Sequence, residues 1–177
     1  QSIRHNAAPK PPKVVVYGVP GIGKTTFASR APNPIFALAE DGLGHLDVPS
    51  FPRATGYQDI LDAIEVLQRE PHDFGTFVLD GLDAVEPMLW QYVANKAGKA
   101  NIEDFGYGKG LSLFAPAEWT RLLGLLDDLR DRRGMCIVLL AHSKVSEFRD
   151  PTLAPYDRYT MRLHDRAESL VRGWTDN

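Results

Sequence analysis

Eight consecutive residues near the N-terminus, Gly18 to Thr25, have the types and spacing that bind phosphate groups. They form a glycine, four free positions and then Gly-Lys-Thr, set between an apolar segment and a helix-forming segment. The glycines let backbone N–H groups approach an anion closely, and the positive end of the following helix adds to the attraction. Lys24 supplies a mobile positive charge for the β- and γ-phosphates, which makes it a candidate catalytic residue, and the Thr25 hydroxyl suits Mg²⁺. The predicted nucleotide-binding residues are Gly18, Val19, Pro20, Gly21, Ile22, Gly23, Lys24, Thr25 and Thr26.

Three further polar residues, Glu40, Asp80 and His142, come directly after short apolar segments. A carboxylate at the end of a hydrophobic strand commonly holds Mg²⁺ in phosphate-transferring enzymes, so Asp80 is predicted as a metal residue beside Thr25. Asp83 is interpreted as a helix cap. Glu40 could orient and deprotonate an attacking water, with its neighbour Asp41 as a competing candidate. His142 could sense the γ-phosphate, or it could be a hydrogen-bonded histidine of no special role.

The elements that must position these residues alternate between strands and helices. Apolar runs predict strands at 13–17, 35–39, 77–79 and 137–141, and a further short strand at 159–163. Because the first four are continuous apolar runs, they indicate an α/β fold whose mostly parallel sheet is covered on both faces. Ligands of such sheets bind at the carboxyl ends of the strands, which is where the candidate residues converge. Helical spacing predicts helices at 25–30, 57–69, 84–97, 116–133 and 164–174.

The remaining segments are predicted to be an arm and loops. Residues 1–12 contain three prolines and little that could pack, so we expect a flexible arm followed by one domain over 13–177. Gly, Pro and polar residues predict loops at 43–56, 98–115 and 143–158. Loops of this length in a compact domain are usually functional or mobile.

Composition narrows the classes of protein. The net charge of −3 gives no general support for a nucleic-acid partner, so any such site must be a local patch. The single cysteine, Cys136, excludes an internal disulfide framework and is typical of a reducing compartment. No apolar run is long enough to span a bilayer and no signal peptide is recognisable, so we expect a cytoplasmic protein without a membrane partner.

With these strand-end residues in place, the chain resembles the RecA-like branch of P-loop ATPases from about Lys13 to Asn177. It is more specifically similar to phage-encoded ATP-binding proteins, a group that includes the Sak-type single-strand annealing proteins. The resemblance implies a three-layer sandwich with strand order 2-3-4-1 plus C-terminal strands, and a catalytic glutamate at Glu40. The phrases that carry it are Gly18–Ala28, Ala39–Leu43, Asp104–Gly110 and Pro155–Tyr159.

The same resemblance implies ATP hydrolysis in the cytoplasm of a phage host, coupled to recombination or annealing of single-stranded DNA. The implied partners are ATP and ADP, single-stranded DNA, single-strand-binding protein and further copies of the chain. Loops 98–115 and 143–158 would face the DNA. Both contain aromatic and cationic residues, which suit single strands because aromatic rings stack on bases while cations follow phosphates. Acidic residues in both loops oppose this hypothesis. The candidate DNA-binding residues are Tyr107, Lys109, Lys144 and Arg149.

Two departures from the family pattern leave alternatives open. His142 stands where the family often has glutamine, and the chain stops at Asn177, where the family normally continues into another strand. A nucleotide-dependent switch or assembly ATPase that binds only protein would use the same phosphate loop. A small-molecule kinase would need an arginine-bearing lid, although nothing marks a substrate pocket. One arginine could instead reach a neighbour's γ-phosphate, the candidates being Arg158, Arg162, Arg166 and Arg172.

Overall fold

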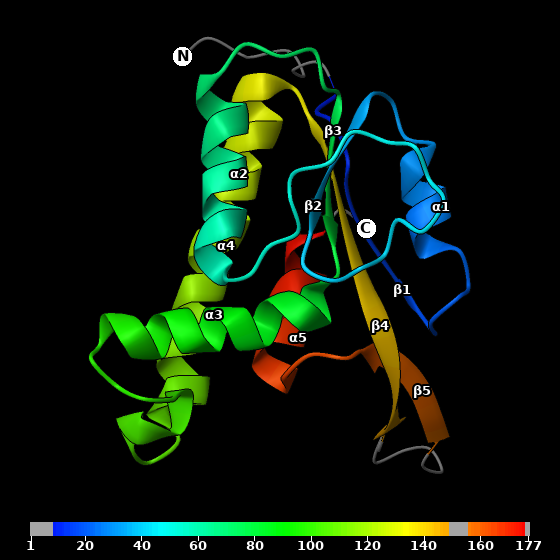
Figure 1. The fold of residues 1–177 in the computed structure, drawn as a ribbon. Coiled ribbons are helices and arrows are strands. Elements are labelled where there is room, and N and C mark those ends of the chain that lie inside the picture. Colours follow the sequence, from blue (N-terminus) through cyan, green and yellow to red (C-terminus); the bar gives the residue numbers. More distant parts are fainter. Residues whose placement is uncertain (1–8, 149–155, 176–177) are drawn as a thin grey trace, which may run out of the picture.

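The structure, a computed structural model, describes residues 9–148 and 156–175. These residues form a five-stranded sheet (Figure 1). Its strands are β1 (Lys13–Gly18), β2 (Pro34–Leu38), β3 (Thr76–Asp80), β4 (Cys136–Phe148) and β5 (Tyr156–Met161). The first four are parallel in the order β1-β4-β3-β2, while β5 pairs antiparallel with β4. The predicted order 2-3-4-1 is therefore confirmed, and the fold is that of a P-loop NTPase.

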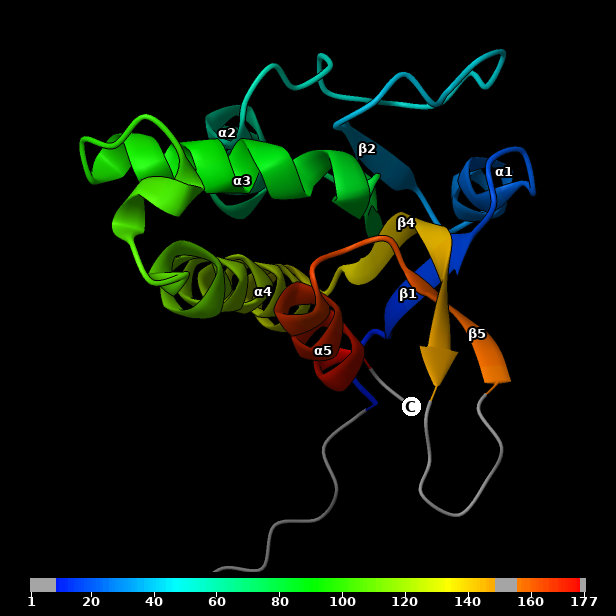
Figure 2. The same ribbon diagram turned by 90° about the horizontal axis from the view of Figure 1, so that it is seen from below.

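Helices cover the sheet unequally (Figures 1 and 2). Side chains of successive strand residues point to opposite faces, so each apolar strand serves two cores. Phe77 and Leu79 face the larger core, whereas Val78 packs with Phe36 and Ala28 in the smaller one. This confirms the prediction of a sheet covered on both faces. The smaller core lies under α1 (Lys24–Ser29), and the larger one under α2 (Tyr57–Arg69), α3 (Leu82–Lys96), α4 (Ala115–Arg133) and α5 (Asp165–Trp174).

The prediction of a loop at 143–158 is wrong for residues 143–148 and 156–158, which form strands. Strand β4 continues past His142 to Phe148 and pairs with β5, so that Lys144 lies opposite Thr160 and Val145 opposite Tyr159. These segments mix polar with β-branched and aromatic residues, a composition that suits an exposed antiparallel pair without a buried apolar run. We call Ser143–Phe148 together with β5 the ribbon. Residues 149–155 lie outside the described residues.

The loop predicted at 98–115 is only partly irregular. It contains the 3₁₀ helix η1 (Ile102–Phe105) and the π-helical turn η2 (Gly110–Phe114), which leads directly into α4. Asn101 accepts hydrogen bonds from the N–H groups of Glu103 and Asp104, which caps η1. The segment lies at the far end of α3 from the sheet (Figure 1). Fifteen helical residues separate it from the strand ends, about 20 Å of helix.

The last residues of the N-terminal arm are attached to the domain. The carbonyls of Pro11 and Pro12 accept hydrogen bonds from the Arg130 side chain and the Ile137 N–H group, and Lys10 forms an ion pair with Asp131. Residues 1–8 lie outside the described part of the chain. None of the helices in that described part combines the length and the hydropathy needed to cross a bilayer.

Candidate functional site

Strand register brings the candidate residues to one edge of the sheet. Gly18 at the end of β1 pairs with His142 in β4, and Asp80 at the end of β3 pairs with Leu140 in β4. Glu40 follows β2 on the other side of β3. Together with the phosphate loop, the side chains of Glu40, Asp80 and His142 line a cavity of about 490 Å³. We call it the strand-end cavity.

The phosphate loop has the backbone that an anion site requires. Gly21 and Gly23 have φ values of 78° and 97°, which side-chain-bearing residues rarely adopt. Gly23 is also the N-cap of α1 and offers no side-chain acceptor, which leaves the N–H groups of the first turn without a capping side chain. The buried Lys24 donates from Nζ to the carbonyl oxygens of Gly18 and Val19, each at 3.2 Å. The loop thus directs backbone N–H groups and one ammonium group at the cavity.

A hydroxyl and a carboxylate lie side by side next to the loop. Thr25 Oγ1 donates to Asp80 Oδ2 at 2.8 Å. Burial raises the pKa of Asp80, while the Thr25 hydrogen bond and the Lys24 charge oppose the rise. A Cβ on Gly42 would lie 3.1 Å from Asp80 Oδ2, so a side chain at this position would crowd the Asp80 carboxylate. A hydroxyl and a carboxylate side by side are oxygen ligands of the kind that fit Mg²⁺, and Thr25 and Asp80 are the residues that would hold it.

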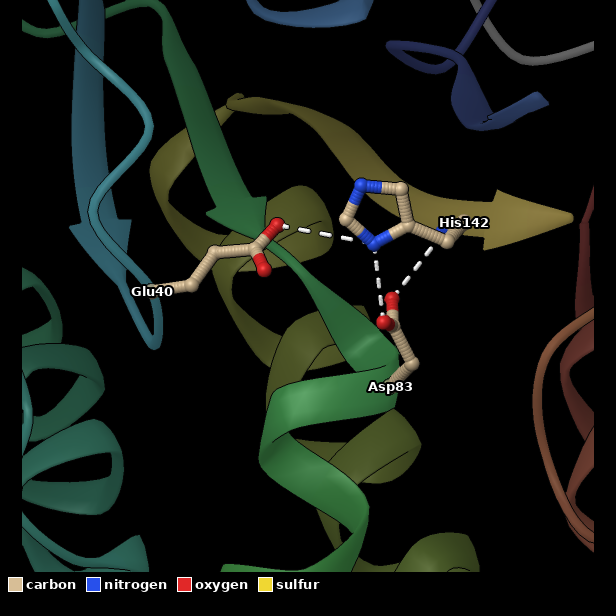
Figure 3. Close-up of side chains that lie close together, drawn as sticks. All are labelled: Glu40, Asp83 and His142. Atoms are coloured by element: carbon tan, nitrogen blue, oxygen red, sulfur yellow. Dashed lines mark hydrogen bonds and ion pairs between the residues drawn. The ribbon is translucent and has the colours of Figure 1, made fainter. Parts of the chain in front are cut away.

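Glu40 and His142 of the cavity wall form a second group with Asp83 (Figure 3). His142 Nδ1 lies 2.8 Å from Asp83 Oδ2 and 3.8 Å from Glu40 Oε1. The backbone N–H of His142 also donates to Asp83 Oδ1 at 2.9 Å. The interpretation of Asp83 as the helix cap is wrong, because Gly81 is the N-cap of α3 and the Asp83 carboxylate binds His142. A His, Asp and Glu this close could also bind a metal ion, but the two hydrogen bonds already account for the arrangement.

The two carboxylates around His142 differ in their electrostatics. Partial burial raises the pKa of Glu40, and the nearby Asp83 and Asp80 charges add to the rise, although His142 and Lys24 oppose it. Burial would also raise the pKa of Asp83, but its hydrogen bonds from His142 outweigh burial and lower it. Asp83 is therefore suited to remain ionised, whereas Glu40 is suited to accept a proton.

Several cavity residues escaped the sequence analysis. Leu43, His45 and Leu46 line the strand-end cavity from the segment that follows Glu40. His45 follows Gly44 in the glycine-bearing segment after Glu40, and a histidine in that position was a signal that the sequence analysis could have used. Gly81 is the other omission, since a Cβ there would lie 2.7 Å from Glu40 Oε1.

The candidate DNA-binding residues lie in separate places. Tyr107 is fully exposed, and it lies with the exposed Lys109 at the far end of α3. Lys144 lies at the base of the ribbon, where its Nζ donates to the Leu163 carbonyl at 2.6 Å and lies 3.5 Å from Asp165. Arg149 falls outside the described residues.

The candidate trans-acting arginines lie outside the cavity lining, in β5, in the turn that follows it and in α5. Arg162 is exposed, and its backbone N–H donates to the carbonyl of His142 at 2.8 Å. Arg172 forms an ion pair with Glu168 one turn earlier in α5. Arg158 lies opposite Ser146 in the ribbon, and Arg166 is exposed in the first turn of α5. Arg162 is thus the candidate whose backbone is joined directly to a cavity residue.

Comparisons with known proteins agree with this geometry. A protein family described as an AAA domain matches residues 10–177, which include the phosphate loop and the three strand-end side chains. A search of curated proteins finds no match.

Proposed function

The chain belongs to the AAA-domain family of P-loop ATPases, and from this premise we propose that it hydrolyses ATP with Mg²⁺, using Glu40 as the general base. The observation that carries the proposal is the convergence of the phosphate loop, Glu40, Asp80 and His142 on one cavity. Its position at the carboxyl ends of parallel strands is the usual ligand position in such folds.

Each group in the cavity has a distinct part in this mechanism. Amides of the phosphate loop and Lys24 bind the phosphates, and Lys24 leaves its two loop carbonyls to do so. Mg²⁺, held by Thr25 and Asp80, would neutralise charge on the phosphates. Glu40 orients the attacking water and accepts its proton, for which its raised pKa is suited. His142 contacts the γ-phosphate.

We further propose that hydrolysis is coupled to single-stranded DNA, in recombination or annealing by a phage RecA-like ATPase of the Sak type. The support is connectivity, because the ribbon begins at the residue after His142 and carries the exposed Tyr156 and Tyr159. A change at the γ-phosphate could reach the ribbon through His142. Cytoplasmic location and association with single-strand-binding protein belong to the same hypothesis.

A second candidate function is a nucleotide-dependent switch that binds only protein. One observation favours it: Val145 and Tyr159 form an exposed apolar pair on the ribbon, and Glu147 and Asp157 follow as an opposed acidic pair. Apolar and acidic groups together suit a protein surface better than a phosphate backbone.

The ATPase rate with and without single-stranded DNA, at two salt concentrations, separates the two candidates. Salt-sensitive stimulation by DNA supports the first, and an unchanged rate supports the switch. Lys24→Ala is the control that identifies contaminating ATPase, and loss of turnover when Mg²⁺ is withheld tests the metal requirement.

We also propose that nucleotide-bound copies assemble, with an arginine such as Arg162 near a neighbour's γ-phosphate. Light scattering with and without an ATP analogue tests this, and a monomer under both conditions would exclude it.

A further inference from the structure

Asp83 binds His142 twice, once at the backbone and once at the ring. Its Oδ1 accepts the backbone N–H of His142 at 2.9 Å, and its Oδ2 lies 2.8 Å from Nδ1 (Figure 3). The side chains are 13% and 17% exposed, so water competes little for these bonds. The sequence gives no hint of this pair, because 59 positions separate the two residues.

The pair determines which ring nitrogen carries a proton. An ionised carboxylate only accepts hydrogen bonds, so a 2.8 Å contact to Asp83 requires a proton on His142 Nδ1. Nε2, on the side of the ring away from Asp83, is then the nitrogen left for a ligand (Figure 3). Because phosphate oxygens also only accept hydrogen bonds, a γ-phosphate contact uses the ring with a proton on both nitrogens.

The surroundings hold His142 in this orientation. Its carbonyl accepts the Arg162 N–H at 2.8 Å, so the backbone is held both by the residue after β5 and by Asp83 of α3. Glu40, in the segment after β2, approaches the same ring nitrogen at 3.8 Å. It does so over Gly81, where any Cβ would collide with its carboxylate. The ring therefore lies between the candidate base and an ionised partner.

We propose that Asp83 is a positioning residue for hydrolysis: it holds His142 with Nδ1 protonated, so that Nε2 presents a charge-assisted donor to the γ-phosphate. This inference rests on the proposed ATPase function but adds a residue that acts through another and does not itself touch ATP. Asp83 thereby links the nucleotide to the residue at which β4 leaves the parallel sheet for the ribbon.

Asp83→Asn is the deciding variant, because asparagine keeps the shape and can still accept the His142 backbone N–H with its oxygen. Its NH₂ group then faces Nδ1 as a donor, which favours the opposite tautomer, with the proton on Nε2. Nitrogen-15 NMR of histidine-labelled protein without nucleotide reads this directly. The signal is assigned among the five histidines by its loss in His142→Gln. We expect a protonated Nδ1 in the wild type and an unprotonated Nδ1 in Asp83→Asn.

Steady-state kinetics give the second measurement. We expect kcat for ATP to fall about tenfold in Asp83→Asn, since the donor loses its charge assistance, with KM changed less than about twofold. Glu86→Gln is the matched control: Glu86 is also an α3 carboxylate that accepts a backbone N–H, from His164, but it lies outside the strand-end cavity. It should leave kcat unchanged.

The two measurements separate failure of this inference from failure of the proposed function. An unprotonated Nδ1 in the wild type, or wild-type kcat in Asp83→Asn, overturns the role of Asp83 even if ATP is hydrolysed. If the wild type hydrolyses no ATP, the proposed function fails and the role in hydrolysis with it. If Asp83→Asn proves unstable in thermal melting, Asp83→Glu keeps the charge. If kcat of Asp83→Glu is partly recovered relative to Asp83→Asn, the inference is supported. If kcat is not recovered at all, the inference is overturned.

Discussion

In the wall of the strand-end cavity Lys24 and Asp80 are buried and hydrogen-bonded, whereas the ribbon carries exposed charged and apolar side chains. Asp80 is 2% exposed and has the Thr25 hydroxyl against it. The ribbon begins at the next residue after His142, yet Val145 and Tyr159 are 58% and 64% exposed there. Burial fixes a few side chains in one geometry and shifts their pKa values, while exposure leaves side chains adaptable. The contrast supports the proposals that the cavity carries out the chemistry and that the ribbon recognises a partner.

The largest effect should come from the candidate base in the cavity. Glu40→Gln keeps the size of the side chain but cannot accept a proton, so we expect ATP hydrolysis to fall by about 10²–10⁴-fold while ATP still binds. Single-turnover assays together with calorimetry measure both quantities. Wild-type turnover in this variant would transfer the role to Asp41, which also lines the cavity.

Lys24→Ala should come next, acting on binding. The Nζ of Lys24 is the ammonium group that the phosphate loop holds at its carbonyls, and its loss leaves the phosphate charge poorly compensated. We expect affinity for magnesium-ATP to fall by about 10²-fold or more, a cost of about 3 kcal/mol. Calorimetry that finds unchanged affinity would remove the phosphate loop from the mechanism.

The sequence predicts some parts of the cavity and not others. The phosphate loop, Glu40 and Asp80 follow from a local motif and from continuous apolar strands, whereas the strand order came from the resemblance to RecA-like ATPases. Asp83 and Gly81 follow from neither, because their roles come from contacts with His142 and Glu40, which are far away in the chain.

The β4 half of the ribbon and the helical turns after α3 were missed for another reason, whereas the strand predicted at 159–163 overlaps β5. Neither has a buried apolar run, so hydrophobic periodicity gave no signal there. For η1 a signal existed: Asn101 followed by Asp104 has the spacing of a capping box. The ribbon could be recognised only from alternation and β-propensity over residues 143–148.

A buried acid between the two regions gives a smaller, pH-dependent effect. Glu86 is 6% exposed and accepts the His164 N–H at 2.9 Å, and burial raises its pKa to about 7 from 4.5. The folded state then binds more protons than the unfolded state between these pKa values, so stability is greatest at low pH and falls as pH rises toward 7. We expect this acid to contribute a loss of at most about 3 kcal/mol between pH 5 and 8.

Glu86→Gln provides the test, because its amide oxygen can accept the same N–H without ionising. Denaturant unfolding of wild type and variant at several pH values isolates the contribution as the difference between the two curves. The variant should gain stability relative to the wild type as pH rises. Parallel curves would show that Glu86 does not titrate in this range.

The smallest expected effects are those of lysine substitutions on DNA binding. They test which exposed region contacts the DNA. Lys109 is exposed at the far end of α3, whereas Lys144 at the ribbon base is held by the Leu163 carbonyl. If single-stranded DNA follows the ribbon, Lys144→Ala should weaken binding and lower its salt slope by about 0.7, the value for one phosphate contact. Lys109→Ala should do the same if the DNA also reaches the far end of α3.

Fluorescence anisotropy with an ATP analogue present, over a series of salt concentrations, measures both slopes. ATP affinity should stay unchanged in both variants, since neither lysine lines the strand-end cavity. A melting curve for Lys144→Ala separates loss of a DNA contact from loss of its bond to Leu163. Because Glu147 and Asp157 are opposed on the ribbon, their repulsion of phosphates must be outweighed for DNA to bind there. Absence of binding by the wild type at low salt would therefore leave the ribbon to a protein partner and favour the switch.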